Sequence, residues 1–137
     1  MLTLDGKGRV TVPARWRDVL MANVNGQLVV AKNPDGCLSL FPADTWEKFE
    51  ANVLALPTQS DGWRRFFIGS ATDIEIDSAS RVLIPPELRS WAGLDEKVKF
   101  MGVGSHFELW DIARHEAHEA AEMAKGRPEP LLNLVIR

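Results

Sequence analysis

A ten-residue pattern occurs twice in this chain and constrains its fold more than any other feature. Residues 4–13 read LDGKGRVTVP, and residues 76–85, 72 positions later, read IDSASRVLIP. Both copies place an aspartate four residues before an arginine, followed by a largely β-branched run that ends at proline. Small and polar residues between two strand-forming runs are typical of a tight turn, because they accept turn dihedral angles at little steric cost. The chain is therefore predicted to contain two related hairpins.

The aspartate and the arginine lie at the two ends of each turn. A carboxylate in this position can accept hydrogen bonds from turn amides or from the guanidinium, which fixes the direction of the arginine. The residues expected to brace the turns are Asp5, Gly8 and Asp77. The second copy has Ser80 where the first has Gly8, so a positive φ there would cost Ser80 about 1 kcal/mol. We therefore expect Arg81 to be held differently from Arg9.

The repetition extends beyond the turns. Each copy continues with a short helical segment, a strand, a second turn and a strand that ends in an aromatic residue. These strands are expected at residues 27–30 and 38–41 in the first half, and at 98–101 and 107–110 in the second. The chain is thus a tandem repeat of a βαββ unit.

Together these segments resemble the MraZ family, bacterial transcriptional regulators built from two domains of the SpoVT-AbrB swapped-hairpin type. The matching segments, in the family's order, are LDGKGRVTVP followed by RWR, then GCLSLFP, RRFFIGSA, IDSASRVLIPPELR with WAGL, and HFELWD. They run from Leu4 to about Asp111, nearly all of the chain. The resemblance implies an α+β, mostly β fold. Two tandem AbrB-like βαββ repeats would form a shared double-ψ-barrel-like core with peripheral helices.

The domain organisation follows from the repeat and from helix signals. Residues 1–46 are expected to form the first SpoVT-AbrB-like domain and residues 70–113 the second. Between them, residues 47–69 are expected to hold connecting helices and a linker, because a helical pattern that begins at Pro42 ends at Pro57. Residues 114–137 are expected to form a C-terminal helix and an apolar tail. Asp111 is expected to cap that helix, which should run through Met123 with Ile112, Ala120 and Met123 available to pack.

The distribution of charge decides whether nucleic acid is a credible partner. The net charge is -3, yet the first seventeen residues carry four bases against one acid, and phosphate contacts depend on the local field. A guanidinium binds phosphate bidentately, and a two-stranded ribbon is narrow enough to enter a major groove. The residues expected to contact DNA are Lys7, Arg9, Arg15, Arg17 and Arg81. For an isolated turn of this kind, the simpler interpretation is an arginine that only bridges its own aspartate. The duplication, the neighbouring bases and the resemblance favour DNA.

The resemblance implies a function and a partner. We expect a sequence-specific, DNA-binding transcriptional regulator that acts on promoter repeats in double-stranded DNA upstream of the division and cell wall gene cluster. It would assemble as a ring-shaped homo-oligomer and reside in the cytoplasm, associated with the nucleoid. The alternative is an oligomeric protein-interaction ring, or an antitoxin-like module, that binds an acidic protein partner. No apolar run approaches the roughly 20 residues of a membrane helix, so no membrane partner is expected.

Enzymatic functions are weaker interpretations. His115 and His118 flank a glutamate, but a zinc helix needs histidines four residues apart, and these are three apart. Surface charge on a helix is the preferred interpretation of that segment. Cys37 follows a turn glycine and starts a strand, which favours a buried thiol over a nucleophile. We therefore expect no catalytic residues, no bound metal and no cofactor.

Overall fold

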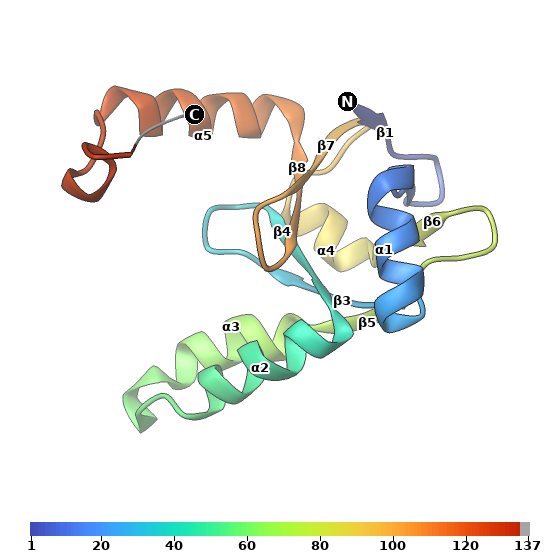
Figure 1. The fold of residues 1–137 in the computed structure, drawn as a ribbon, viewed down its shortest axis with the longest axis horizontal. Helices are drawn as coiled ribbons and strands as arrows, with labels where there is room; N and C mark the ends of the chain where they lie inside the picture. Colours follow the sequence, from blue (N-terminus) through green and yellow to red (C-terminus); the bar gives the residue numbers. More distant parts are fainter. Residues whose placement is uncertain (135–137) are drawn as a thin grey trace.

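The strands of the chain form two antiparallel sheets, one of six strands and one of two, in a computed structural model that describes residues 1–134 (Figure 1). Each strand is short, and most are bounded by the turns that the sequence predicts. The strands are β1 (Leu2–Thr3), β2 (Arg9–Thr11), β3 (Gln27–Lys32), β4 (Leu38–Pro42), β5 (Thr72–Glu75), β6 (Arg81–Leu83), β7 (Lys97–Gly102) and β8 (Phe107–Asp111).

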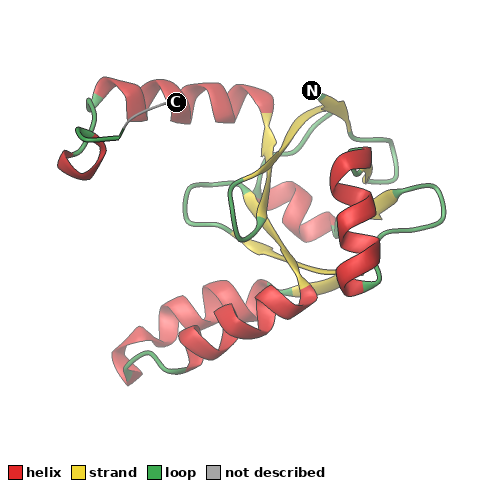
Figure 2. Cartoon of the chain, in the orientation of Figure 1, coloured by secondary structure: helices red, strands yellow, loops and turns green. Residues whose placement is uncertain are grey.

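Helices accompany strands along the chain (Figure 2), and the strands pair antiparallel, so the α+β class is confirmed. The helices are α1 (Ala14–Val24), α2 (Ala43–Leu54), α3 (Asp61–Ser70), α4 (Pro86–Trp91) and α5 (Ile112–Ala124), with 3-10 turns η1 (Thr58–Ser60) and η2 (Glu129–Leu131). The expectation of a mostly β chain is wrong, because α-helices hold more of the described residues than strands do. Within residues 1–134, no helix is long and apolar enough to cross a membrane.

The two repeats exchange their first strands. β1 of the first repeat pairs with β7 of the second, and β5 of the second pairs with β3 of the first. β2 and β6, which follow the two turns, pair with each other. The large sheet has the order β1-β7-β8-β4-β3-β5, and the main buried cluster draws on both repeats. The repeats therefore share one core.

Two strand pairs place an approximate twofold axis between the repeats. Val10 pairs with Val82, its counterpart 72 residues later. Ser39 pairs with Glu108, its counterpart at the 69-residue offset of the last strands. A residue that pairs with its own counterpart must lie beside the symmetry axis, as at a twofold interface between identical subunits. The axis therefore runs through both sheets.

α2 and α3 form a helical hairpin that projects from the sheet (Figure 1). Pro42 precedes α2, as predicted, and Trp46 and Val53 are buried on its inner face. The linker expected within residues 47–69 is short, because η1 leads directly into α3, which begins at Asp61. Aromatic rings join this hairpin to the sheet. Phe41 of β4 stacks on Phe49, with ring centroids 4.9 Å apart.

α5 extends away from the sheets at the other end of the molecule (Figure 1). The Asp111 carboxylate caps it as predicted, by accepting a hydrogen bond of 3.0 Å from the Arg114 amide. The sequence marked Ile112, Ala120 and Met123 as residues available to pack, but Met123 is 73% exposed. Part of the predicted apolar tail, residues 135–137, lies outside the described residues. Leu132 and Leu134 before it are exposed.

The predicted burial of Cys37 is confirmed, since its exposed fraction is 0%. Burial raises the pKa of the thiol, and the charges of Glu108 and Asp35 raise it further. We expect a water-soluble maleimide to label Cys37 at least about a hundredfold more slowly in the native protein than in urea, because the reactive thiolate is both rare and inaccessible. Mass spectrometry over a time course measures this ratio. Equal rates in the two conditions would contradict the burial.

Candidate nucleic-acid interface

The β2–β6 ribbon presents both arginines on one face. In this antiparallel pair Arg9 lies opposite Leu83, and Thr11 lies opposite Arg81. The valine pair on the axis points to the other side, into the core. Because side chains alternate between the faces of a strand, the four flanking residues share the outer face of the ribbon. The structure thus brings together two arginines that are far apart in the sequence.

Asp5 braces the first turn, as predicted. Its Oδ1 accepts hydrogen bonds from the amides of Lys7 and Arg9, both at 2.9 Å, and its Oδ2 accepts one from Nε of Arg9 at 2.8 Å. The Gly8 amide closes the turn by donating to the Asp5 carbonyl at 3.0 Å. The Arg9 guanidinium engages this carboxylate through Nε. Its two terminal nitrogens make no hydrogen bond within the described part of the chain, so a directed donor pair stays open to a partner.

Asp77 braces the second turn in the same way, but the arginine there is held differently. Oδ1 of Asp77 accepts hydrogen bonds from the amides of Ala79 and Arg81, both at 2.9 Å. Nε of Arg81 is 3.5 Å from Oδ2 of Asp77, yet it is buried and makes no hydrogen bond within residues 1–134. Nη1 of Arg81 also lies 3.9 Å from Oδ2 of Asp5. Arg81 therefore lies near two carboxylates, whereas Arg9 makes a short hydrogen bond to one. This agrees with the expectation that the two arginines are held differently.

The backbone of both turns is left-handed at the same position. φ is +86° at Gly8 and +67° at Ser80, so the requirement for a positive φ is confirmed in both copies. Glycine adopts this region freely, whereas a serine there is strained. The strain predicted for Ser80 is therefore present.

Each turn also contacts an arginine from the helix of the other repeat. Nη1 of Arg17 in α1 donates a hydrogen bond of 3.0 Å to Oγ of Ser80. Arg89 in α4 donates from Nε to the Ile84 carbonyl at 2.9 Å, and its guanidinium lies against Gly8, where an added Cβ would be only 2.4 Å from Cζ. Sequence reasoning missed Arg89. The signal was present, because Arg89 repeats Arg17 at the same 72-residue offset as the turns.

The remaining predicted bases lie outside the ribbon, Lys7 in the first turn and Arg15 and Arg17 in α1. Lys7 is exposed at the tip of the first turn. Arg15 is exposed at the start of α1, with its Cζ 4.6 Å from the centre of the Trp16 ring. Arg17 also approaches Asp18, at 3.2 Å. The structure thus gathers Lys7 and Arg9 in one turn, whereas Arg17 already has partners within the chain.

The carboxylates of the turns make stability depend on pH. The hydrogen bond from the Arg9 amide is the main cause that holds the pKa of Asp5 at about 2, below its usual 3.8, although desolvation opposes it. The Arg81 amide likewise lowers the pKa of Asp77. A lowered pKa in the folded state means that the stabilisation is complete above the unfolded value. It is lost as pH falls from 3.8 to about 2.

We therefore expect Asp5→Asn to flatten the loss of stability between pH 4 and pH 2, because the carboxylate that titrates there is gone. Thermal unfolding midpoints of the parent and the variant across roughly pH 2–6 measure the difference. Asp73→Asn, at an exposed position in β5, is the matched control and should retain the parent's profile. Parallel profiles for Asp5→Asn and the parent would contradict the bracing role.

Comparison with known proteins decides the family. A family model described as "MraZ protein, putative antitoxin-like" matches the chain twice, at residues 1–66 and 67–129. The chain belongs to the MraZ family. It is 55% identical over 130 residues to the transcriptional regulator MraZ of Methylibium petroleiphilum, covering 95% of this chain and 89% of the relative. It is 52% identical over 132 residues to the transcriptional regulator MraZ of Burkholderia mallei, covering 96% and 93%.

Both MraZ relatives are named transcriptional regulators, as the resemblance implied, and neither name is that of an enzyme. Each family match contains one copy of the braced turn, which confirms two MraZ repeats. The finer division of the chain at residues 46, 69 and 113 stays a prediction.

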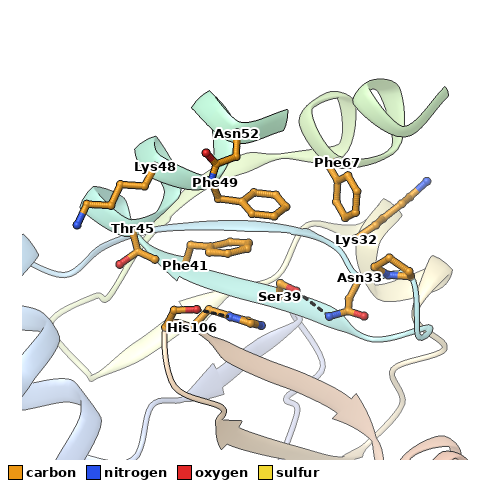
Figure 3. A pocket seen from close by; sticks show the side chains of 12 residues that line it. Lys32, Asn33, Ser39, Phe41, Thr45, Lys48, Phe49, Asn52, Phe67 and His106 are labelled. Carbon is orange, nitrogen blue, oxygen red and sulfur yellow. Dashed lines mark hydrogen bonds between the residues drawn. The ribbon is translucent and has the colours of Figure 1, made fainter. Parts of the chain in front are cut away.

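A pocket of about 540 Å³ lies in another part of this MraZ-family chain, among β4, α2, α3 and the loop before β8 (Figure 3). The rings of Phe41, Phe49 and Phe67 line it, together with His106, which stacks on Phe41. At its base, Nδ2 of Asn33 donates to Oγ of Ser39 at 3.0 Å. The pocket contains no residue of either turn, so it is separate from the candidate nucleic-acid interface.

The histidines of α5 differ from the expectation. His115 is 7% exposed and packs edge-on against Trp110, with ring centroids 5.3 Å apart, so surface charge is the wrong interpretation for it. The first turns of α5 cover Trp110, which the helical pattern alone does not reveal. Nε2 of His118 lies 3.6 Å from Oδ1 of Asp35. Within residues 1–134, no group of three or more His, Cys, Asp or Glu is arranged to hold a metal ion.

Proposed function

We propose that this chain regulates transcription by binding double-stranded DNA sequence-specifically through the β2–β6 ribbon. The observation that carries the proposal is the state of Arg9. Its Nε is fixed by Asp5 at 2.8 Å, whereas its terminal nitrogens make no hydrogen bond within the described residues. A guanidinium held by one edge keeps the geometry that recognises guanine or phosphate bidentately. A two-stranded antiparallel ribbon has the width of a major groove reader.

The structure supports the other predicted DNA contacts to different degrees, depending on whether each side chain is exposed or already has a partner within the chain. Lys7 is exposed at the tip of the first turn, so its ammonium can reach a phosphate beside the groove. Arg15 and Arg17 follow in α1, and we propose that they hold phosphates. Arg17 is the weaker of the two, because Ser80 already accepts a hydrogen bond from it. Arg81 is also weaker than Arg9, because it lies near the carboxylates of both turns.

Family membership supports a finer proposal about the target and the location. We propose that the target is a set of repeats upstream of the division and cell wall gene cluster, and that the protein acts in the cytoplasm, associated with the nucleoid. Footprinting on the DNA immediately upstream of its own gene tests the target. Protection spread evenly over that DNA, with no repeated element, would argue against it.

The proposed assembly is a ring-shaped homo-oligomer, in which each small basic patch recurs around a rim. Two groups of exposed apolar residues support association between copies. Leu54 and Trp63, at the tip of the α2–α3 hairpin, are 60% and 52% exposed, and Leu132 and Leu134, beyond α5, are 63% and 66% exposed. Surface patches of this kind commonly mark interfaces. When one subunit of the assembly binds a DNA repeat, the linked subunits are held at a high effective concentration near the neighbouring repeats, so several weak contacts together bind tightly. Sedimentation equilibrium measures the subunit number.

The finer fold proposal is a swapped-hairpin, double-ψ-barrel-like core shared by the two AbrB-like repeats. The exchange of β1 and β5 and the pairing of β2 with β6 support it, because each hairpin is completed by the other repeat. This arrangement supports DNA binding indirectly. It joins the two arginine-bearing strands into one ribbon.

A salt titration tests DNA binding against the alternative, a protein-interaction ring or antitoxin-like module that meets an acidic partner. The family description contains the word antitoxin-like, which is why this second function is retained. For DNA recognition, log K for a promoter-length duplex should fall linearly with log salt. Lys7→Ala should make that slope shallower by roughly one unit for each phosphate contact that is lost. Fluorescence anisotropy measures both quantities. Equal binding of specific and random duplexes at moderate salt would favour the protein partner.

A further inference from the structure

Two positions on the outer face of the ribbon differ although the twofold axis relates them. Thr11 and Leu83 are counterparts separated by 72 residues, just as Arg9 and Arg81 are. In the ribbon, Thr11 lies opposite Arg81, and Leu83 lies opposite Arg9. The face therefore carries identical arginines but unlike neighbours, a hydroxyl at one end and an aliphatic side chain at the other.

Leu83 is an exposed apolar side chain with an arginine on two sides of it in the ribbon. Leu83 is 53% exposed, whereas Val82, the residue before it in β6, points into the core and is 0% exposed. Arg9 lies across the ribbon from it, and Arg81 lies on the same face two residues away, roughly 7 Å along the strand. A partner that covers Leu83 must therefore also meet Arg9, whose terminal nitrogens make no hydrogen bond within the described residues, and Arg81, which lies near the carboxylates of Asp77 and Asp5. Donors that are covered without a hydrogen-bond partner are costly to desolvate.

DNA meets both requirements within one groove. Phosphates border the major groove and attract the arginines, while thymine projects a 5-methyl group among the base edges. Aliphatic side chains recognise that methyl group by direct contact, and threonine can offer either a methyl or a hydroxyl. An acidic protein partner would also match the arginines and offer apolar atoms to Leu83. Only DNA carries a thymine 5-methyl group, so removal of that group distinguishes the two partners.

We propose that Leu83 and Thr11 are specificity-determining residues of the ribbon, and that Leu83 packs against the 5-methyl group of a thymine. This inference rests on the proposed DNA-binding function. Because Thr11 and Leu83 differ, the two halves of the ribbon read different bases. The site for one subunit is accordingly not a palindrome, and the chain binds it in one orientation.

Selection of duplexes from a randomised pool first defines the sequence that the parent protein prefers. Each thymine of that duplex is then replaced by deoxyuridine, which removes only the methyl group. We expect one replacement to weaken parent binding by roughly fourfold, the value for one buried methylene-sized group. Leu83→Ala should bind the thymine and deoxyuridine duplexes equally. Leu83→Thr should change the selected base at that position.

Controls separate this role from structural and electrostatic effects. Leu83→Ala should leave the salt slope and the subunit number unchanged, because Leu83 carries no charge and contacts DNA rather than another copy. Val103→Ala, at an exposed apolar position after β7 (43% exposed), should retain the full methyl effect. An undiminished methyl effect in Leu83→Ala, no methyl effect in the parent, or a changed subunit number would each overturn the inference. If the parent protein selects no sequence at all, the proposed function itself fails.

Discussion

Arg9→Ala is expected to abolish most of the specific DNA affinity, with a loss of roughly 10- to 100-fold for the selected duplex at moderate salt. The Arg9 guanidinium is aimed by its Nε hydrogen bond of 2.8 Å to Asp5, so a bidentate contact needs little further ordering. Alanine removes the two terminal nitrogens that would contact DNA, and it also removes the Nε donor that binds the Asp5 carboxylate. Anisotropy titrations measure the affinity for the specific duplex and for a random duplex. A larger loss for the specific duplex shows that Arg9 contributes to sequence recognition.

Two variants make the Arg9 prediction sharper. Arg9→Lys keeps the charge but loses the planar fork, so we expect it to retain binding to random DNA and the salt slope while it loses most of the specificity. Lys125→Ala, at an exposed position just after α5, removes the same charge far from the ribbon and should bind as the parent does. Thermal unfolding confirms that each variant is folded. Specific binding by Arg9→Ala equal to that of the parent would refute the interface.

Gly8→Ser is expected to be far more damaging than its mirror change, Ser80→Gly, although both exchange the same two residue types. At Gly8, φ is +86° and an added Cβ would lie 2.4 Å from Cζ of Arg89. Serine there would carry about 1 kcal/mol of backbone strain. It would also displace Arg89 from the Ile84 carbonyl, for about 1 kcal/mol more. The free energy of unfolding should therefore fall by about 2 kcal/mol.

Ser80→Gly should be nearly neutral. It relieves about 1 kcal/mol of strain at φ +67° but loses the hydrogen bond that Arg17 donates to Oγ, which is worth a similar amount. Urea unfolding of the two variants and the parent gives the three free energies. Equal costs for the two changes would show that Arg89 does not constrain the first turn. Arg89→Ala tests the same contact, because Gly8→Ser introduced into that variant should cost only about half of what it costs in the parent, since the hydrogen bond to the Ile84 carbonyl is already gone.

Local features of the fold were predictable because their causes are local. The carboxylate of Asp5 accepts hydrogen bonds from residues two and four positions later, so the spacing in the sequence already contains the braced turn. The same holds for Asp77, for the proline at the start of α2 and for the Asp111 cap of α5. The positive φ at Ser80 was also foreseeable, by comparison with the first copy.

Other features were mispredicted or missed for identifiable reasons. His115 was interpreted as surface charge because a helix rich in alanine and glutamate is usually exposed to solvent. The first turns of α5 nevertheless pack on Trp110, and His115 contacts that ring. The balance of helix and strand was misjudged because several strands are very short, with only two residues in β1 and three each in β2 and β6. Arg89 was overlooked because its contact with Gly8 joins two repeats.

The sequence by itself determined that this protein contains two braced, arginine-bearing turns in a tandem repeat, because hydrogen bonds between close neighbours depend only on residue type and spacing. Only the tertiary structure decided that the two arginines share one ribbon face, that Leu83 lies opposite Arg9, and that Arg17 reaches Ser80, 63 residues away. Such contacts depend on which strands pair and in which register. A shift of one residue would turn every side chain of the ribbon to its other face.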